Sequence, residues 1–143
     1  MSFNVMIVDD SGAMRAVIRK IISISGFKVD RCFEANNGRE ALELLAKDWV
    51  DVIISDINMP EVNGLELLST LKQDELFRNI PVIMITTEGS EERREEALNH
   101  GARGFIKKPF LPEDLKRVLH EVIGVGEDGA YAEDTTDADG VDF

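Results

Sequence analysis

The sequence predicts an α/β fold: a five-stranded, doubly wound parallel sheet with helices on both faces. Two observations support this prediction. First, short apolar runs that suit strands buried on both faces alternate five times with stretches whose apolar residues recur at helical spacing. Second, polar residues follow several of the apolar runs directly, where open parallel sheets carry their functional groups. Alternating strands and helices imply right-handed crossovers, and therefore parallel strands.

Each element can be assigned from its pattern and its boundary residues. The predicted strands are residues 3–8, 29–33, 50–55, 81–86 and 104–107. The predicted helices begin near Ser11, near Asn37 or Gly38, at Asn63, at Ser90 and at Pro112. Asn63 and Glu66 have the spacing of a capping box, and Gly26 is the expected end of the first helix, because glycine favours helix ends. Trp49, beside the third strand, is expected to pack against the core.

The composition fits one domain with a negatively charged surface. The 143 residues are 43% hydrophobic, enough for a core, and their net charge is −12. This charge disfavours binding to nucleic acid or to an anionic membrane. Cys32 is the single cysteine, which excludes an intramolecular disulfide. The chain starts without a secretion signal, and no apolar run approaches the roughly 20 residues that span a bilayer. We therefore expect a cytoplasmic protein without membrane insertion.

Residues 124–143 differ in composition from the rest of the chain. They hold seven acidic residues and no Lys or Arg, so they carry seven of the 12 net negative charges. Because they are rich in Gly, Ala, Asp and Thr, they can bury too little apolar surface to offset the entropy of ordering. The sequence therefore predicts a domain at 1–123 and an acidic, flexible tail at 124–143.

The exits of the predicted strands carry chemically unusual residues. Asp9 and Asp10 follow the first strand, Asp56 the third, Thr86 ends the fourth, and Lys108 follows the fifth. Carboxylates that converge at one sheet edge repel each other, so they require a cation nearby. Oxygen ligands that leave room for water and phosphate favour Mg²⁺. The sequence therefore predicts a magnesium site at this edge.

The chemistry that such a site supports is phosphoryl transfer, with Asp56 as the best nucleophile. A carboxylate can accept a phosphoryl group to form an acyl phosphate, while a cation, a lysine and a threonine hydroxyl bind its oxygens. Any one of these aspartates alone would be better explained as a loop residue that caps a helix. Their joint occurrence with Thr86 and Lys108 favours the functional interpretation.

Five segments together resemble the response-regulator receiver domain of two-component signalling. They are IVDDS (residues 7–11), SDINMP (55–60), GLELL (64–68), ITTE (85–88) and KPF (108–110). The resemblance covers about residues 3–123 and is strongest to the single-domain chemotaxis regulators of this family. It implies a flavodoxin-like fold with strand order 2-1-3-4-5.

The resemblance also implies roles for individual residues. Asp56 matches the phosphoacceptor, and Asp9 and Asp10 match the acidic pair that binds Mg²⁺ together with the main-chain carbonyl of Asn58. Lys108 matches the lysine that pairs with the phosphoryl group, and the peptide bond after it is typically cis in this family.

Further residues match positions that switch the protein or time its signal. Thr86 matches the switch hydroxyl and Phe105 the aromatic switch position, where the chemotaxis regulators have Tyr instead of Phe. Asn58 and Glu88 match positions that tune hydrolysis of the acyl phosphate. From their polar side chains we expect a short-lived phosphoryl group.

The family implies a binding switch with intrinsic autophosphorylation and autodephosphorylation rather than an enzyme. A sensor histidine kinase would donate the phosphoryl group to the receiver, which is expected to be a monomer. Phosphorylation would then change a partner-binding face formed by its fourth helix, fifth strand and fifth helix. The flagellar motor switch is one candidate partner, although the acidic helix at 90–99 departs from the chemotaxis regulators. A phosphorelay intermediate that passes the group to a histidine phosphotransfer protein is the alternative. An aspartyl-phosphate phosphatase is disfavoured, because Asn58 stands where such enzymes commonly need a second acid.

Overall fold

The computed structural model describes residues 3–124 and contains one five-stranded parallel sheet. Its strands are β1 (Phe3–Val8), β2 (Val29–Ala35), β3 (Val52–Asp56), β4 (Val82–Thr86) and β5 (Gly104–Lys107). The order is β2-β1-β3-β4-β5 and every neighbouring pair is parallel, which confirms the predicted fold. The tail predicted at 124–143 lies, apart from Gly124, outside the described residues.

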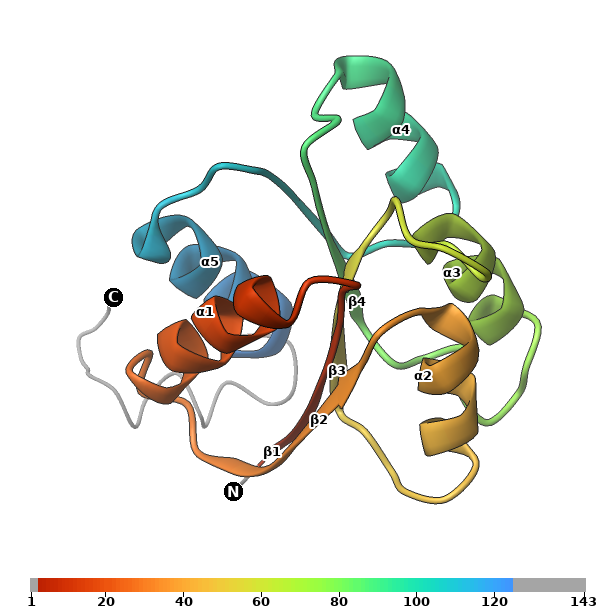
Figure 1. Ribbon diagram of the computed structural model, residues 1–143, viewed down its shortest axis with the longest axis horizontal. Coiled ribbons are helices and arrows are strands. Elements are labelled where there is room, and N and C mark those ends of the chain that lie inside the picture. Colours follow the sequence, from red (N-terminus) through yellow and green to blue (C-terminus); the bar gives the residue numbers. More distant parts are fainter. Residues whose placement is uncertain (1–2, 125–143) are drawn as a thin grey trace.

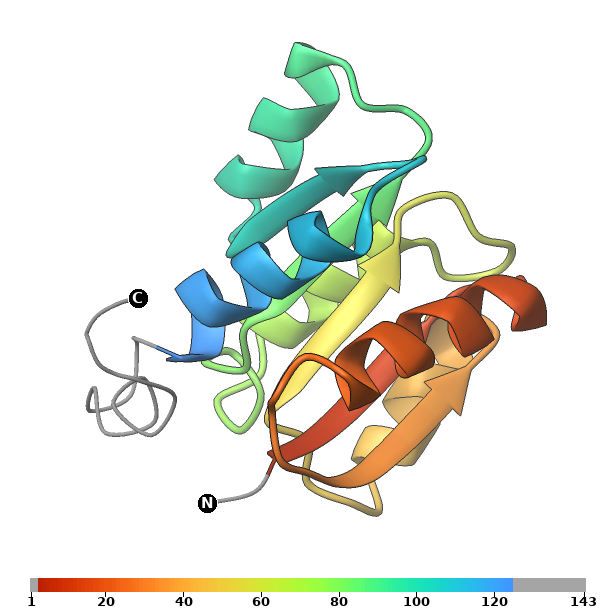
Figure 2. The same ribbon diagram turned by 90° about the vertical axis from the view of Figure 1, so that its left-hand side faces the viewer.

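The helices cover both faces of the sheet, as the doubly wound prediction requires. One face carries α1 (Gly12–Ser23) and α5 (Pro112–Leu119), and the other carries α2 (Gly38–Leu45), α3 (Gly64–Lys72) and α4 (Glu91–Asn99) (Figure 1). A π-helical turn at His120–Gly124 continues α5. Figure 2 shows α1 and α5 side by side in front of the sheet. Within residues 3–124, no helix has both the length and the apolar character needed to cross a membrane.

The helix starts follow from side-chain caps in the sequence. Ser11, Asn37, Asn63 and Ser90 each accept a hydrogen bond from the backbone N–H three residues later. At Asn63 the capping box predicted from the sequence is present, because the Glu66 carboxylate accepts the N–H of Asn63 in return. Such caps typically stabilise a helix by about 1 kcal/mol each.

The core consists of two layers, one on each side of the sheet. Along β1, Val5 and Ile7 face α1 and α5, whereas Met6 and Val8 face the side of α2 and α3. All four side chains are at most 2% exposed. Burial on both faces explains why the strands read as continuous apolar runs rather than as alternating patterns.

Three strands differ from their predicted bounds, and one of them, β4, begins at Val82 rather than at residue 81. β2 continues to Ala35 instead of ending at residue 33, because it is an edge strand on which Glu34 can pair with arginines of α1. A charged residue is therefore compatible with this strand. β3 begins at Val52 rather than at residue 50 and includes Asp56, which places that carboxylate on the rigid end of a central strand.

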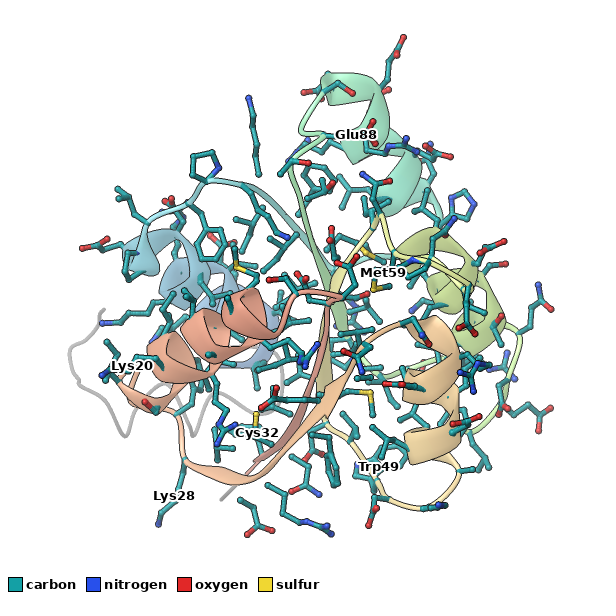
Figure 3. All side chains as sticks on the ribbon, viewed as in Figure 1. Lys20, Lys28, Cys32, Trp49, Met59 and Glu88 are labelled. Atoms are coloured by element: carbon teal, nitrogen blue, oxygen red, sulfur yellow. The ribbon has the colours of Figure 1, made fainter. Side chains whose placement is uncertain are left out.

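The prediction that Trp49 packs against the core is wrong. The residue is 53% exposed and lies in the loop before β3. Its indole N–H donates to the Asp51 carboxylate at 3.0 Å, and its carbonyl accepts from the Asn4 side chain at 2.9 Å. Figure 3 shows Trp49 beside the lower end of α2, far from Glu88 near α4. These polar contacts hold the residue at the entry to the sheet and leave its ring in solvent.

Candidate functional site

Three carboxylates meet where β1 and β3 leave the sheet. Asp9 and Asp10 follow β1, and Asp56 is the last residue of β3. Each offers an oxygen, and these oxygens lie within 4.8 Å of one another. Asp9 is 1% exposed and Asp56 is 9% exposed, whereas Asp10 is open to solvent. Because β1 and β3 are neighbouring parallel strands, the topology itself brings these residues together.

Lys108 extends from the end of β5 to the carboxylates. Its ammonium donates to Asp9 Oδ2 at 3.0 Å and lies 3.4 Å from Asp56 Oδ2. Its backbone N–H donates to the carbonyl of Thr86 at 2.8 Å, and the peptide bond to Pro109 is cis. In the described part of the chain, this ammonium is the one cation bonded to the carboxylate groups of the cluster. The ionised cluster therefore keeps a net negative charge.

The environment of Asp56 disfavours its charged form. Burial raises the pKa of Asp56, the ammonium of Lys108 opposes this effect, and the nearby Asp9 carboxylate adds to it. The N–H of Ile57 donates to Asp56 Oδ1 at 2.7 Å and lowers the pKa again. The net shift is upward, so an additional positive charge at this edge would stabilise the ionised carboxylate.

The donor atoms of the cluster fit a hard divalent cation. All three are carboxylate oxygens, which suit Mg²⁺ or Ca²⁺ far better than softer metals. A small number of protein ligands with one side open to water is typical of Mg²⁺. Asp9, Asp10 and Asp56 are the residues that would hold it. The main-chain carbonyl of Asn58 stays a predicted ligand.

The loop after Asp56 passes so close to it that only glycine fits at position 64. A Cβ at Gly64 would lie 2.2 Å from the carbonyl oxygen of Asp56 and 2.8 Å from Cα of Ile57. The N–H of Gly64 donates to the carbonyl of Ile57 at 2.8 Å. Gly64 thereby folds the β3–α3 loop back over the end of β3. This role of Gly64 was not predicted from the sequence, although a glycine directly after the Asn63 cap was the available signal.

The exit of β4 lies beside the cluster but is connected differently. Thr86 is fully buried, and its hydroxyl accepts the N–H of Glu88 at 3.1 Å. The Glu88 carboxylate accepts from the Asn58 side chain at 3.1 Å and from Arg93 at 2.9 Å. These two bonds lower the pKa of Glu88, with the Asn58 bond as the larger cause. Two of the predicted residues, Asn58 and Glu88, thus bridge the β3–α3 and β4–α4 loops.

Phe105, the predicted aromatic switch residue, lies within β5 rather than after the end of a strand. It pairs with Met84 in the register of β4 and β5 and is half-buried against the core on the side of α2 and α3. Phe105 is therefore adjacent to the fourth strand that ends in Thr86.

Comparisons with known proteins agree with this geometry. Residues 5–120 match the family described as the response regulator receiver domain. The chain is 41% identical over 129 residues to a chemotaxis protein CheY homolog of Campylobacter jejuni, covering 90% of this chain and 98% of that one. It is 42% identical over 123 residues to chemotaxis protein CheY1 of Helicobacter pylori, covering 85% and 98% respectively.

A solved structure shows the same arrangement of strands and helices. The chemotaxis protein CheY4 of Vibrio cholerae superposes with a TM-score of 0.76 at 36% identity, covering 86% of this chain and all of that one. The family match, the relatives and the carboxylates at the sheet edge lead to the same conclusion: this chain belongs to the response regulator receiver domain family.

Proposed function

We propose that the chain is a phosphorylation-dependent signalling switch that receives a phosphoryl group from a histidine kinase on the carboxylate of Asp56. One observation carries this proposal. The Lys108 ammonium contacts both Asp9 and Asp56, although the three residues are far apart in the sequence. In this position it can neutralise an incoming anion. A buried nucleophile, a fixed cation and further carboxylates for a metal are the parts that phosphoryl transfer to an aspartate needs.

In the proposed reaction, an Asp56 oxygen attacks the phosphorus of a phosphohistidine. An O–P bond forms, the P–N bond breaks, and its electron pair returns to the imidazole of the kinase. Asp56 Oδ1 is held by the N–H of Ile57, so Oδ2, next to Lys108, is the oxygen that attacks. Mg²⁺ bound by the three aspartates and the Asn58 carbonyl would supply positive charge for the phosphoryl oxygens.

The other residues of the site receive roles from their positions. The Lys108 ammonium would exchange part of its contact with Asp9 and Asp56 for a phosphoryl oxygen. The Thr86 hydroxyl, which accepts one hydrogen bond from Glu88, still has its own proton to donate to that oxygen. Movement of Thr86 would then shift the packing of Phe105, and the populations of two conformations of the face formed by α4, β5 and α5 would change. Phe105 lacks a hydroxyl, so this coupling rests on ring packing.

The partners are proposed by the same reasoning. The names of the Campylobacter and Helicobacter relatives support a role in chemotaxis-like signalling, with a sensor histidine kinase as donor and the flagellar motor switch as a candidate target. We propose a short-lived phosphoryl group, because the polar side chains of Asn58 and Glu88, two positions after Asp56 and Thr86, bond to each other. A phosphoryl group that survives for many hours in purified protein with Mg²⁺ would contradict this short lifetime.

The test is incubation with acetyl phosphate and Mg²⁺, followed by intact-mass measurement. We expect the wild type to gain the mass of one phosphoryl group, and Asp56→Asn or chelation of Mg²⁺ to abolish the adduct. Asp30→Asn, which removes an exposed carboxylate on β2, should leave it unchanged. Absence of any adduct on the wild type refutes the proposal. Rapid turnover of small phosphate esters would favour a phosphatase, and passage of the group to a histidine phosphotransfer protein would favour a relay.

A further inference from the structure

The side chain of Arg15 connects three segments next to the acidic cluster: the start of α1, the exit of β1 and the end of β2. It lies in the first turn of α1, and its side chain is only 16% exposed. One guanidinium nitrogen donates to the main-chain carbonyl of Asp9 at 2.6 Å and to the Asn36 side chain at 2.8 Å. A second nitrogen donates to Glu34 at 2.9 Å. The fork of donors thus joins the exit of β1 to the end of β2.

The bond to Asp9 acts on the peptide unit that leads into Asp10. The carbonyl of Asp9 belongs to the planar group that joins the two aspartates, so fixing this oxygen fixes the direction in which the chain enters Asp10. Within residues 3–124, the Asp10 side chain makes no hydrogen bond or ion pair of its own. The backbone is therefore what aims this exposed carboxylate toward Asp9 and Asp56.

The Asp9 residue is held at its other atoms as well. Its N–H donates to Ala35, its Oδ1 accepts from the N–H of Ser11, and its Oδ2 accepts from Lys108. Arg15 supplies the remaining constraint, on the carbonyl. Without it, the peptide between the two aspartates would lose a charge-assisted hydrogen bond at a partly buried position, which is among the stronger kinds of contact.

Glu34 keeps Arg15 in place, and Arg19 provides a natural comparison. Both arginines pair with Glu34, and the bond from Arg15 is the main reason why the pKa of Glu34 is lowered. The Arg19 side chain, however, is 61% exposed, and within residues 3–124 it bonds to Glu34 but not to Asp9. The two residues therefore share charge, helix and partner but differ in their contact with the acidic pair.

We propose that Arg15 is a positioning residue for the metal site: it holds the Asp9–Asp10 peptide so that Asp10 can bind the cation together with Asp9 and Asp56. Arg15 itself would touch neither the cation nor the phosphoryl group. The part of this proposal that concerns phosphorylation rests on the proposed function, whereas the part that concerns Mg²⁺ affinity does not.

The sign of the effect separates positioning from simple charge. Removing a cation near three carboxylates favours a bound dication by Coulomb's law, so loss of charge alone would tighten Mg²⁺ binding. Loss of positioning would weaken it. Outer contacts that orient metal ligands typically contribute 10–100-fold to affinity. We therefore expect Arg15→Met to weaken Mg²⁺ binding by about tenfold, and Arg19→Met to leave it unchanged or slightly tighter.

The experiment is calorimetric titration of the wild type, Arg15→Met, Arg15→Lys and Arg19→Met with MgCl₂. Urea denaturation of each variant first confirms that it is folded. Lysine can donate one bond to the Asp9 carbonyl but cannot bridge to Glu34 as a fork, so Arg15→Lys should show an intermediate affinity. If Arg15→Met is unfolded, the Mg²⁺ affinity of Arg15→Lys is compared with that of Arg19→Met instead. Equal or tighter affinity in the folded Arg15 variants, relative to Arg19→Met, overturns the proposal.

A second readout uses acetyl phosphate over a range of Mg²⁺ concentrations. In Arg15→Met, the Mg²⁺ concentration for half-maximal phosphorylation should rise about tenfold while the rate at saturating Mg²⁺ stays near that of the wild type. A lower plateau with an unchanged midpoint would contradict positioning. If the wild type binds Mg²⁺ but is never phosphorylated, the proposed function fails while the titration still decides the role of Arg15.

Discussion

The acidic edge of the sheet has two halves that are held together in different ways. The fixed half comprises the exits of β1 and β3, where buried Asp9 and Asp56 are bound by backbone N–H groups. The adjustable half comprises the exit of β4 and the loop after it, from Thr86 to Arg93. There, the β4–α4 loop contacts the β3–α3 loop through the side chain of Glu88, which is 52% exposed.

This difference matters because the two kinds of contact differ in strength. Hydrogen bonds between buried groups are costly to break, because a buried donor or acceptor that loses its partner cannot bond to water instead. Exposed ion pairs are screened by solvent and contribute little. The first half is therefore suited to hold a cation and a phosphoryl group in one geometry. In the second half, the loop beyond the buried Thr86 is held by more exposed contacts, so we expect a change of conformation there to cost less.

Among changes to the fixed half, we expect replacement of Gly64 by a larger residue to have the largest effect. In Gly64→Ala, the new Cβ would overlap the backbone of Asp56 and Ile57, which cannot move without displacing the end of β3. We expect a loss of about 3 kcal/mol in the free energy of unfolding, measured by urea denaturation.

Gly12→Ala is the matched control for this prediction. Its Cβ would meet only the end of the Arg15 side chain, at 3.4 Å, so its stability should stay within about 1 kcal/mol of the wild type. If Gly64→Ala is as stable as Gly12→Ala, the close approach of the loop does not constrain the site.

We expect the negative charge of Asp56, in the fixed half, to destabilise the folded protein. Because its pKa is raised in the folded protein, the ionised carboxylate disfavours folding, and the penalty is complete above the raised pKa. Without Mg²⁺ at neutral pH, we expect Asp56→Asn to be more stable than the wild type by about 1 kcal/mol. The measurement is thermal unfolding in a chelating buffer.

The pH dependence of this difference checks its cause. As the pH falls through the raised pKa toward the ordinary aspartate range, the wild-type carboxyl becomes protonated and the advantage of Asp56→Asn should shrink. Added Mg²⁺ should stabilise the wild type more than the variant. A variant that is less stable than the wild type at neutral pH, while Asp30→Asn is unaffected, would show that Lys108 outweighs burial at this site.

The sequence was sufficient to predict the fold because the rules for parallel sheets leave few choices. Strict alternation of strands and helices determined the sheet, and the exits of neighbouring strands had to lie at one edge. This is why Asp9, Asp56 and Lys108 could be predicted to converge. The Asn63 capping box could be predicted for a different reason, since it depends on local spacing alone.

Features that depend on side chains from distant segments could not be predicted. Arg15 reaches the Asp9 carbonyl and Glu34 at the same time, and no periodicity encodes such a reach. The need for glycine at position 64 arises from the backbone of Asp56, eight positions earlier in the chain. Trp49 was misjudged because an apolar ring beside a strand can equally face solvent when its polar atoms find partners.

The smallest expected effect concerns Arg93 in the adjustable half. Arg93→Met removes one of the two groups that hold the Glu88 carboxylate, but the Arg93 and Glu88 side chains are 30% and 52% exposed, so their ion pair is partly screened by solvent. We expect the midpoint of thermal unfolding to change by no more than about 2 °C. Hydrogen exchange at residues 87–90 should nevertheless become several-fold faster, because the β4–α4 loop loses its link to α4.

Arg94→Met is the control for Arg93→Met, because Arg94 pairs at 3.6 Å with Glu91 within the same helix and, in the described part of the chain, forms no ion pair with Glu88. It should leave exchange at 87–90 unchanged. Both variants should keep the Mg²⁺ affinity of the wild type, in contrast to Arg15→Met. If Arg93→Met weakens Mg²⁺ binding as strongly as Arg15→Met, the two halves are coupled through Asn58 and Glu88 even without phosphorylation. An unchanged affinity with faster exchange would instead show that the loop can move while the metal ligands stay in place.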